Sequence, residues 1–162
     1  MGTYAAETNV SPEQSRMEIE STLRRWNAEA FMYGQDQRGA VVGFVLRTRQ
    51  IRFVVELPVR DDKAFKWTNH IPPRRRTLRQ EEEAYQQAIR QRWRALNLVI
   101  KAKLEAVESG IASFDQEFLA QLVLPNGQTV GDAVAPRIIE GIESNEMPSL
   151  LPDFGPRAIE SA

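Results

Sequence analysis

The sequence predicts one α+β domain, in which an N-terminal helix, a three-stranded antiparallel meander and a long helix build the core. Three observations predict this fold. Apolar residues recur at helical spacing near the N-terminus, short β-branched and aromatic runs follow, and a long helical period returns after residue 80. The 162 residues, 42% of them hydrophobic, suit a single core. We expect residues 1–143 to form this domain and the proline-punctuated residues 144–162 to form a tail.

The first helix has a clear start signal. Ser11 is placed as the N-cap, Pro12 at the first helical position, and Gln14 where it completes a capping box. The helix should end near Arg25. Its apolar residues recur at helical spacing and place one narrow face on the core: Ile19, Leu23 and Trp26.

The three strands are short segments rich in β-branched and aromatic residues. They are "AEAFMYG", "AVVGFVLR" and "IRFVVEL", and the segments "GQDQRG" and "TRQ" between them read as turns. In the third strand apolar residues alternate with Arg52, Val54 and Glu56, so one face should be core and the other partly solvated. The inward residues are Ile51, Phe53, Val55 and Leu57.

A long loop of about twenty residues follows Pro58, because residues 59–78 show no sustained period. Loops of this length inside a domain are usually functional or disordered. The long helix should open with "EEEAYQQ", whose acids suit the positive end of the helix dipole, and run to Ser109 with Gly110 as its stop.

The long helix has an apolar arc and a polar stripe when its residues are placed at 100° intervals. Arg92 and Lys103 fall inside or at the edge of the apolar sector, where a charge needs a partner. The arc consists of Tyr85, Ile89, Trp93, Leu96, Ile100, Leu104 and Val107, and alanines extend one flank. The stripe on the other flank, which we expect to face solvent, consists of Arg90, Arg94, Asn97 and Lys101.

The C-terminal part should be smaller and helical. Ser113 and Gln116 cap a helix that buries Phe114, Phe118 and Leu122, and "VLPNGQTV" reads as a small hairpin. Another helix is expected around three isoleucines, with Pro136 breaking or kinking it. These are Ile138, Ile139 and Ile142.

Composition narrows the function more than any motif does. The chain has no cysteine and one histidine, which excludes disulfides, thiolate nucleophiles and multi-histidine metal sites. It has neither a membrane-spanning apolar run nor a secretory signal, so we expect a cytoplasmic protein without membrane contact. Its net charge of -1 is unevenly spread. Residues 47–79 hold ten Arg or Lys against three acids, and residues 105–162 hold ten acids against two arginines.

The basic middle of the chain provides the candidate site. Arginine clusters pair with phosphates, and a nearby exposed tryptophan can stack on a base. The alternative is that these cations merely solvate the loop or pair with the acidic C-terminal part. The candidate nucleic-acid-binding residues are Lys63, Lys66, Trp67, Arg74, Arg75, Arg76 and Arg79 in the loop region, with Arg90, Arg94 and Lys101 of the helix stripe.

Enzymatic function has the least support. Asp61-Asp62-Lys63 matches the end of a nuclease metal site only loosely, with Asp36 or Glu56 as the earlier carboxylate. The lysine follows a strand end, and Asp36 is in a turn. His70 has no marked partner for catalysis. We therefore expect no catalytic residue, metal or cofactor, with a metal-dependent nuclease as the remote option.

Several stretches carry a resemblance to a known group of proteins. They are "YAAETNVSPEQSRMEIESTLRRW", "AEAFMYG", "IRFVVELPVRDD" and "RQRWRALNLVIKAKLEAVESGIASFDQEFLAQLVLPNGQTVG". Over Tyr4 to Pro152 the chain resembles a family of small uncharacterised proteins of tailed bacteriophages and prophages. That family has no assigned activity, so the resemblance transfers no functional residue. It implies expression in a bacterial host cytoplasm.

Two functions follow as hypotheses. The first is a non-enzymatic phage accessory protein that binds DNA or RNA through the basic loop and the helix stripe, with salt-sensitive affinity. The alternative is a protein-interaction module that inhibits a host defence or replication complex through its acidic surface or tail. The sequence leaves the oligomeric state open, a homo-oligomer included.

Overall fold

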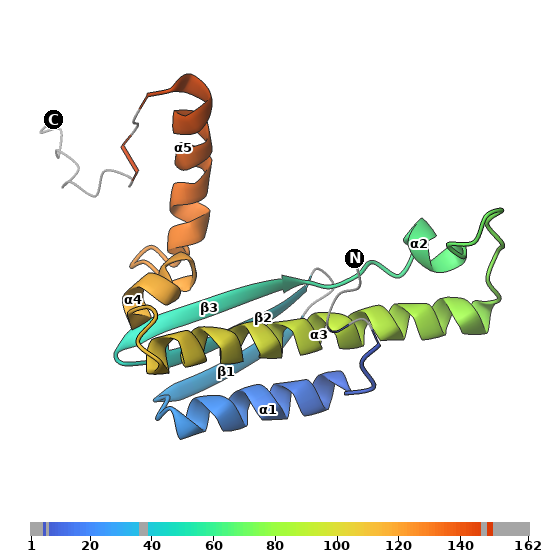
Figure 1. The fold of residues 1–162 in the computed structure, drawn as a ribbon, viewed down its shortest axis with the longest axis horizontal. Helices are drawn as coiled ribbons and strands as arrows, with labels where there is room; N and C mark the ends of the chain where they lie inside the picture. The colour runs from blue at the N-terminus through green and yellow to red at the C-terminus, as the bar shows by residue number, and fades with distance from the viewer. Residues whose placement is uncertain (1–4, 6, 36–38, 147–148, 151–162) are drawn as a thin grey trace, which may run out of the picture.

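Two long helices cover one side of a small antiparallel sheet in the computed structural model (Figure 1), which describes residues 5, 7–35, 39–146 and 149–150. This arrangement is the predicted α+β fold. The elements in chain order are α1 (Pro12–Arg25), β1 (Ala30–Gln35), β2 (Gly39–Leu46), β3 (Arg49–Glu56), α2 (Lys63–Lys66), α3 (Leu78–Glu108), α4 (Phe114–Glu117), the 3-10 helix η1 (Leu119–Gln121) and α5 (Val130–Ser144).

The start of α1 is the predicted one. The Ser11 hydroxyl accepts a hydrogen bond from the Gln14 backbone N–H at 3.1 Å, and Pro12 occupies the first helical position. Ile19 and Leu23 are buried, and Trp26 is partly buried beside them. The spacing of these residues therefore predicted the buried face of the helix correctly.

The sheet is a meander in the order β1-β2-β3, with both pairs antiparallel. The second turn is shorter than expected. Leu46 pairs with Arg49, so the loop consists only of Arg47 and Thr48, both at positive φ (53° and 62°), and the predicted turn "TRQ" is wrong. A two-residue loop of this kind normally contains Asn or Gly, which is why the sequence did not reveal it. The first predicted turn includes residues 36–38, which lie outside the described residues.

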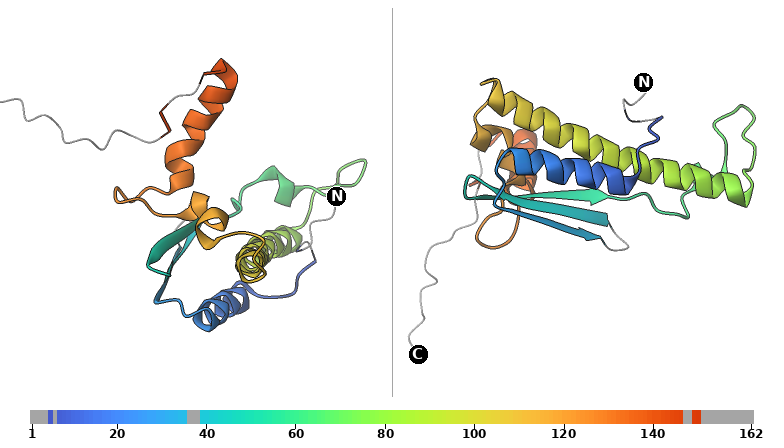
Figure 2. Two further views of the ribbon diagram at one scale, coloured as in Figure 1. Left: turned by 60° about the vertical axis from the view of Figure 1, so that its left-hand side comes forward. Right: turned by 90° about the horizontal axis from the view of Figure 1, so that it is seen from below.

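The core lies between the sheet and the helices α1 and α3 (Figure 2). The predicted alternation in β3 is confirmed, because Ile51 and Phe53 are buried and Val55 and Leu57 pack against the core. From β2 the inward residues are Ala40, Val42, Phe44 and Leu46. From α3 the core receives Trp93, Leu96, Ile100 and Leu104.

Helix α3 begins earlier than expected, at Leu78 rather than at residue 81. Thr77 and Gln80 form a reciprocal capping box, with the Thr77 hydroxyl accepting from the Gln80 N–H and the Gln80 side chain accepting from the Thr77 N–H. A capping box satisfies two backbone donors and so fixes the helix start. The predicted end is confirmed, since Ser109 is the C-cap and Gly110 has a φ of +74°.

The C-terminal part contains the predicted short elements. Ser113 and Gln116 form the capping box of α4, and Phe114 and Phe118 are buried. The predicted hairpin is closed by a bridge between Val123 and Thr129. Helix α5 is continuous through Pro136, so of the expected break or kink the break does not occur. The helix contacts η1 and stands away from the sheet and from α1 and α3 (Figure 1). None of the described helices is both long and apolar enough to span a membrane.

Candidate interaction surfaces

The polar stripe of α3 faces α1, and the expectation that it faces solvent is wrong. Glu18 of α1 accepts three hydrogen bonds at one carboxylate oxygen, from Arg94 (2.8 Å), Asn97 (2.7 Å) and Lys101 (3.1 Å). Asn97 is fully buried. Because one acid of α1 holds these donors between two packed helices, Arg94 and Lys101 are partly buried and serve the contact between α1 and α3. We call Glu18 and its three partners the Glu18 cluster.

The charge of Glu18 is favoured by this arrangement. Burial raises the pKa of the Glu18 carboxyl, but the hydrogen bonds from Lys101, Asn97 and Arg94 together outweigh burial and hold the pKa below its ordinary value. The sequence contained a signal for this acid, because Ser15, Glu18 and Thr22 form a polar line along the face of α1 next to Ile19. That line matches the stripe of α3.

The remaining cations of α3 differ from one another. Arg90 donates to the side chain of Gln87 in the same helix. Lys103 has the internal partner expected from its position, because it donates to the Glu117 carbonyl at 2.6 Å and to the Glu117 carboxylate at 3.1 Å. Arg92 is exposed, so the expectation that it lies in the buried apolar sector is wrong. The exposed flank of α3 is the alanine side, because α1 packs on the opposite flank.

The predicted basic loop is folded back on itself at the N-terminal end of α3. Thr68 and Arg74 are linked through a backbone hydrogen bond of 2.9 Å, a bridge joins Trp67 to Arg75, and the Arg76 N–H donates to the Lys66 carbonyl at 2.9 Å. We call residues 63–77 the distal hairpin. It contains five Lys or Arg and no acid.

Most cations of the distal hairpin and its flanks have local partners. Arg76 donates to the backbone carbonyls of Ala64 and Phe65 and so ties the hairpin together. Ion pairs link Lys66 to Asp61 (3.2 Å), Arg75 to Glu81 (4.0 Å), Arg79 to Glu83 (3.2 Å) and Arg60 to Glu82. All these acids lie at residues 61–83. Among the described residues, no cation of the loop pairs with an acid of the C-terminal part, so the pairing that the alternative expected is absent there.

Three of the predicted nucleic-acid-binding residues on the distal hairpin remain exposed and could contact a ligand. Lys63 and Arg74 are exposed and have no side-chain partner among the described residues. Trp67 is 44% exposed. Beside them is a shallow pocket of about 570 Å³, lined by Lys63, Ala64, Trp67, Thr68, Asn69 and Pro73. A cation and an aromatic ring at one recess can hold an anionic or an apolar group.

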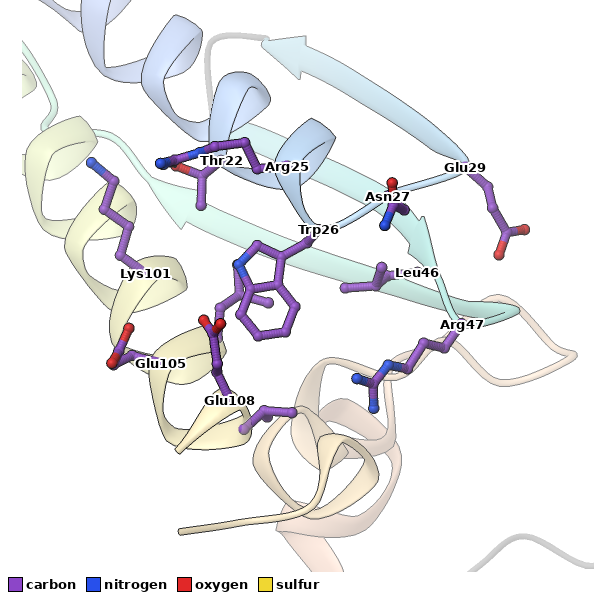
Figure 3. Close-up of a pocket in the computed structure, with 12 residues that line it drawn as sticks. Thr22, Arg25, Trp26, Asn27, Glu29, Leu46, Arg47, Lys101, Glu105 and Glu108 are labelled. Carbon is purple, nitrogen blue, oxygen red and sulfur yellow. Dashed lines mark hydrogen bonds between the residues drawn. The ribbon is translucent and has the colours of Figure 1, made fainter. Parts of the chain in front are cut away.

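A larger cleft of about 1010 Å³ opens where α1 and α3 end (Figure 3). The Trp26 ring lies in its middle, with Leu46 to one side and Glu105 and Glu108 of α3 to the other. Three acids and three cations line it, so its charge is balanced. Two of the six already serve the fold, since Lys101 binds Glu18 and Glu29 accepts from the Thr48 N–H at 3.1 Å. The cleft is a recess without a paired nucleophile and base among its lining residues.

Helix α5 exposes three isoleucines close together in sequence. Ile138, Ile139 and Ile142 are 44%, 55% and 75% exposed, and α5 has no buried residue. The sequence predicted the helix but gave no reason to expect that these isoleucines lie outside the core. Arg137 donates to the Ser149 carbonyl at 2.7 Å, and a hollow of about 620 Å³ lies beside Ile138, Gly141 and Ile142. The predicted tail beyond Leu150 lies outside the described residues.

Two of the acids considered for a nuclease site, Asp61 and Asp62, have structural roles, whereas Asp36 lies outside the described residues. Asp62 caps α2 by accepting from the Ala64 N–H at 2.9 Å, and Asp61 pairs with Lys66. His70 is exposed in the distal hairpin. Within residues 5, 7–35, 39–146 and 149–150, no group of three His, Asp or Glu side chains is arranged to hold a metal ion.

Comparison with known proteins adds no family to these observations. No protein-family model, curated protein or solved structure matches the chain.

Proposed function

We propose that the protein is a non-catalytic protein-interaction module that binds its partner through α5. The observation that carries this proposal is the exposure of Ile138, Ile139 and Ile142 on a helix that buries none of its own residues. Contiguous exposed apolar surface on a folded protein marks an interaction site more often than a structural one.

Helix α5 has the features of a docking helix. Ile142 lies four residues after Ile138 and three after Ile139, and these are spacings that apolar anchors use when a helix lies in a groove. Fully burying each such side chain contributes about 1.5–3 kcal/mol. Helix α5 touches the rest of the fold chiefly at η1. The free part of the helix is therefore accessible over most of its length.

The cellular setting follows from the resemblance given above. In a bacterial cytoplasm during infection, a host defence or replication complex is the partner that we propose. The module would act by occupying a surface of that complex.

Nucleic-acid binding is the second candidate, and one observation favours it. Lys63 and Arg74 lack side-chain partners among the described residues and lie with Trp67 on one exposed hairpin. The helix stripe argues against this candidate, because Arg94 and Lys101 pair with Glu18 and are not free to bind phosphates. The remaining surface offers few phosphate contacts, which are the main source of affinity for nucleic acid.

The experiment that tests the first candidate places a photo-crosslinking amino acid at Ile139 in the full chain, expressed in a bacterial host. The matched control carries the same amino acid at Met17, which is also exposed and apolar but lies on α1. We expect a discrete crosslinked protein from position 139 only, and its loss with Ile142→Asp. The partner identified by mass spectrometry should then bind the purified protein directly. Equal crosslinking from both positions would reject α5 as the docking surface.

The second candidate is tested by titrating labelled single- and double-stranded oligonucleotides at low and high salt. Binding that weakens with salt and is lost in a Lys63→Ala, Arg74→Ala variant would support it. An unchanged affinity in that variant would reject the distal hairpin as a nucleic-acid site.

A further inference from the structure

The chain carries opposite charges on two separate projections. The distal hairpin has five cations and no acid, whereas residues 130–146 contain four acids and only Arg137 as a cation. Lys63 and Arg74 of the hairpin have no side-chain partner among the described residues, and neither do Glu140 and Glu143 of α5. Each projection therefore has at least two charges of one sign without a side-chain partner among the described residues.

These two projections cannot reach each other within one chain. The distal hairpin lies at the N-terminal end of α3, while α5 rises beside α4 near the C-terminal end of α3 (Figure 1). Helix α3 has 31 residues and is therefore about 46 Å long. At this separation their charges are screened from each other, since the screening length at 0.1 M salt is about 10 Å.

Both projections also expose apolar side chains. On the hairpin Ile71 is almost fully exposed and Trp67 is 44% exposed, next to the pocket of about 570 Å³. On α5 the exposed apolar residues are the three isoleucines. The two surfaces thus carry opposite charges, and both expose apolar side chains. This combination is typical of two surfaces that form one interface.

We propose that α5 of one copy docks on the distal hairpin of a second copy of this chain. The proposal rests on the proposed function of α5 as a docking helix, and it gives this helix a second binding partner besides the host complex, namely another copy of the chain. Glu140 and Glu143 face Lys63 and Arg74 of the second copy, and an isoleucine of α5 enters the pocket beside Trp67. The contact joins two different surfaces, so a pair of copies keeps one free helix on one copy and one free hairpin on the other, and assembly continues into a closed ring or an open chain.

The experiment measures the molar mass of the full chain by light scattering across a concentration series, at low and high salt and after nuclease treatment. Two variants each remove one half of the contact. The helix variant is Ile138→Ser with Ile142→Ser, and the hairpin variant is Lys63→Ala with Arg74→Ala. All four positions are exposed, so circular dichroism should show an unchanged fold in both variants.

We expect the wild-type chain to form species larger than a dimer, which become smaller as salt rises. Each variant alone should be monomeric. An equal mixture of the two variants should form a dimer and nothing larger, because only one intact helix and one intact hairpin remain to meet.

Three results would overturn this inference. The first is a wild-type chain that stays monomeric at all concentrations. The proposed function would still hold in that case if the photo-crosslinking amino acid at position 139 captured a host protein. Assembly that survives in the hairpin variant but not in the helix variant would indicate pairing of α5 with α5. Assembly that disappears after nuclease treatment would indicate that nucleic acid, rather than α5, occupies the hairpin.

Discussion

The Glu18 cluster and the distal hairpin are both rich in cations, yet they differ in where the neutralising acid lies. In the Glu18 cluster one carboxylate from α1 serves Arg94 and Lys101 of α3, and both cations are held between packed helices. In the hairpin, acids within twenty residues pair with cations that stay exposed, such as Arg75 and Glu81. In these two groups, the acid that is distant in sequence holds partly buried cations, whereas the local acid Glu81 leaves Arg75 on the surface.

This difference has an energetic consequence. Ion pairs between exposed side chains contribute roughly 0–1 kcal/mol, because solvent screens them and the side chains lose freedom. Removing one partner of a buried pair costs more, since the other charge stays buried without compensation. The two groups of cations should therefore respond differently to the same kind of substitution.

The largest effect is expected for Glu18→Ala. This substitution removes the carboxylate that accepts hydrogen bonds from Arg94, Asn97 and Lys101. The buried Asn97 amide and the two cations then lack this acceptor. We expect the free energy of unfolding to fall by about 2 kcal/mol, below the roughly 3–5 kcal/mol of a fully buried pair, because the Glu18 side chain is 30% exposed. Urea denaturation measures this loss.

The matched control is Glu20→Ala on the same helix. Glu20 pairs only with Arg24, four residues away, and this pair is exposed. Its loss should change stability by less than about 0.5 kcal/mol. If both substitutions have equal effects, the Glu18 cluster does not differ from a surface ion pair.

The contrast also explains how far the sequence could predict the structure. Local signals were reliable: Ser11 and Gly110 mark helix ends, and the alternation from Ile51 to Leu57 gives the buried face of β3. The start of α3 was missed by three residues, although Thr77 and Gln80 carry a capping-box pattern. These features depend on neighbours in sequence, which is why they can be read from it.

The candidate site was less predictable, because the role of a charged stripe depends on what packs against it. Arg94 and Lys101 look like a solvated face until α1 places Glu18 against them. The same holds for Ile138 and Ile142, which look like core residues until α5 is found apart from the core. Periodicity shows which residues share a face but not what covers that face.

A second, smaller effect is expected for Lys103→Ala. Lys103 donates to the carbonyl and the carboxylate of Glu117, which ties α3 to the end of α4. Its loss should lower the free energy of unfolding by about 1 kcal/mol, the usual contribution of such a hydrogen bond. Arg92→Ala is the control, because Arg92 is exposed on the same helix. Equal unfolding midpoints for the two variants would contradict the assigned role of Lys103.

The third prediction concerns the pH dependence of stability. Its effect on the free energy of unfolding at any one pH should be smaller than that of Lys103→Ala. The pKa of Glu18 is lowered in the folded protein, so its charge contributes stability above its unfolded pKa, about 4.3, and that contribution is lost as pH falls through the folded pKa. The stability difference between wild type and Glu18→Gln should therefore be largest near neutral pH and shrink in acid. Urea denaturation at several pH values measures this difference. A constant difference would argue against a charge-based role.

The smallest effect on stability is expected in the distal hairpin itself. The Lys63→Ala, Arg74→Ala variant removes two exposed cations without side-chain partners among the described residues, so the free energy of unfolding should change by less than about 0.5 kcal/mol. Arg76→Ala is the informative control, because the Arg76 side chain donates to the carbonyls of Ala64 and Phe65 and holds the hairpin closed. We expect that variant to speed amide hydrogen exchange within residues 63–77 while the exchange of α1 and α3 stays unchanged. If the double variant loosens the hairpin as much as Arg76→Ala does, its two cations are structural and cease to be candidates for binding.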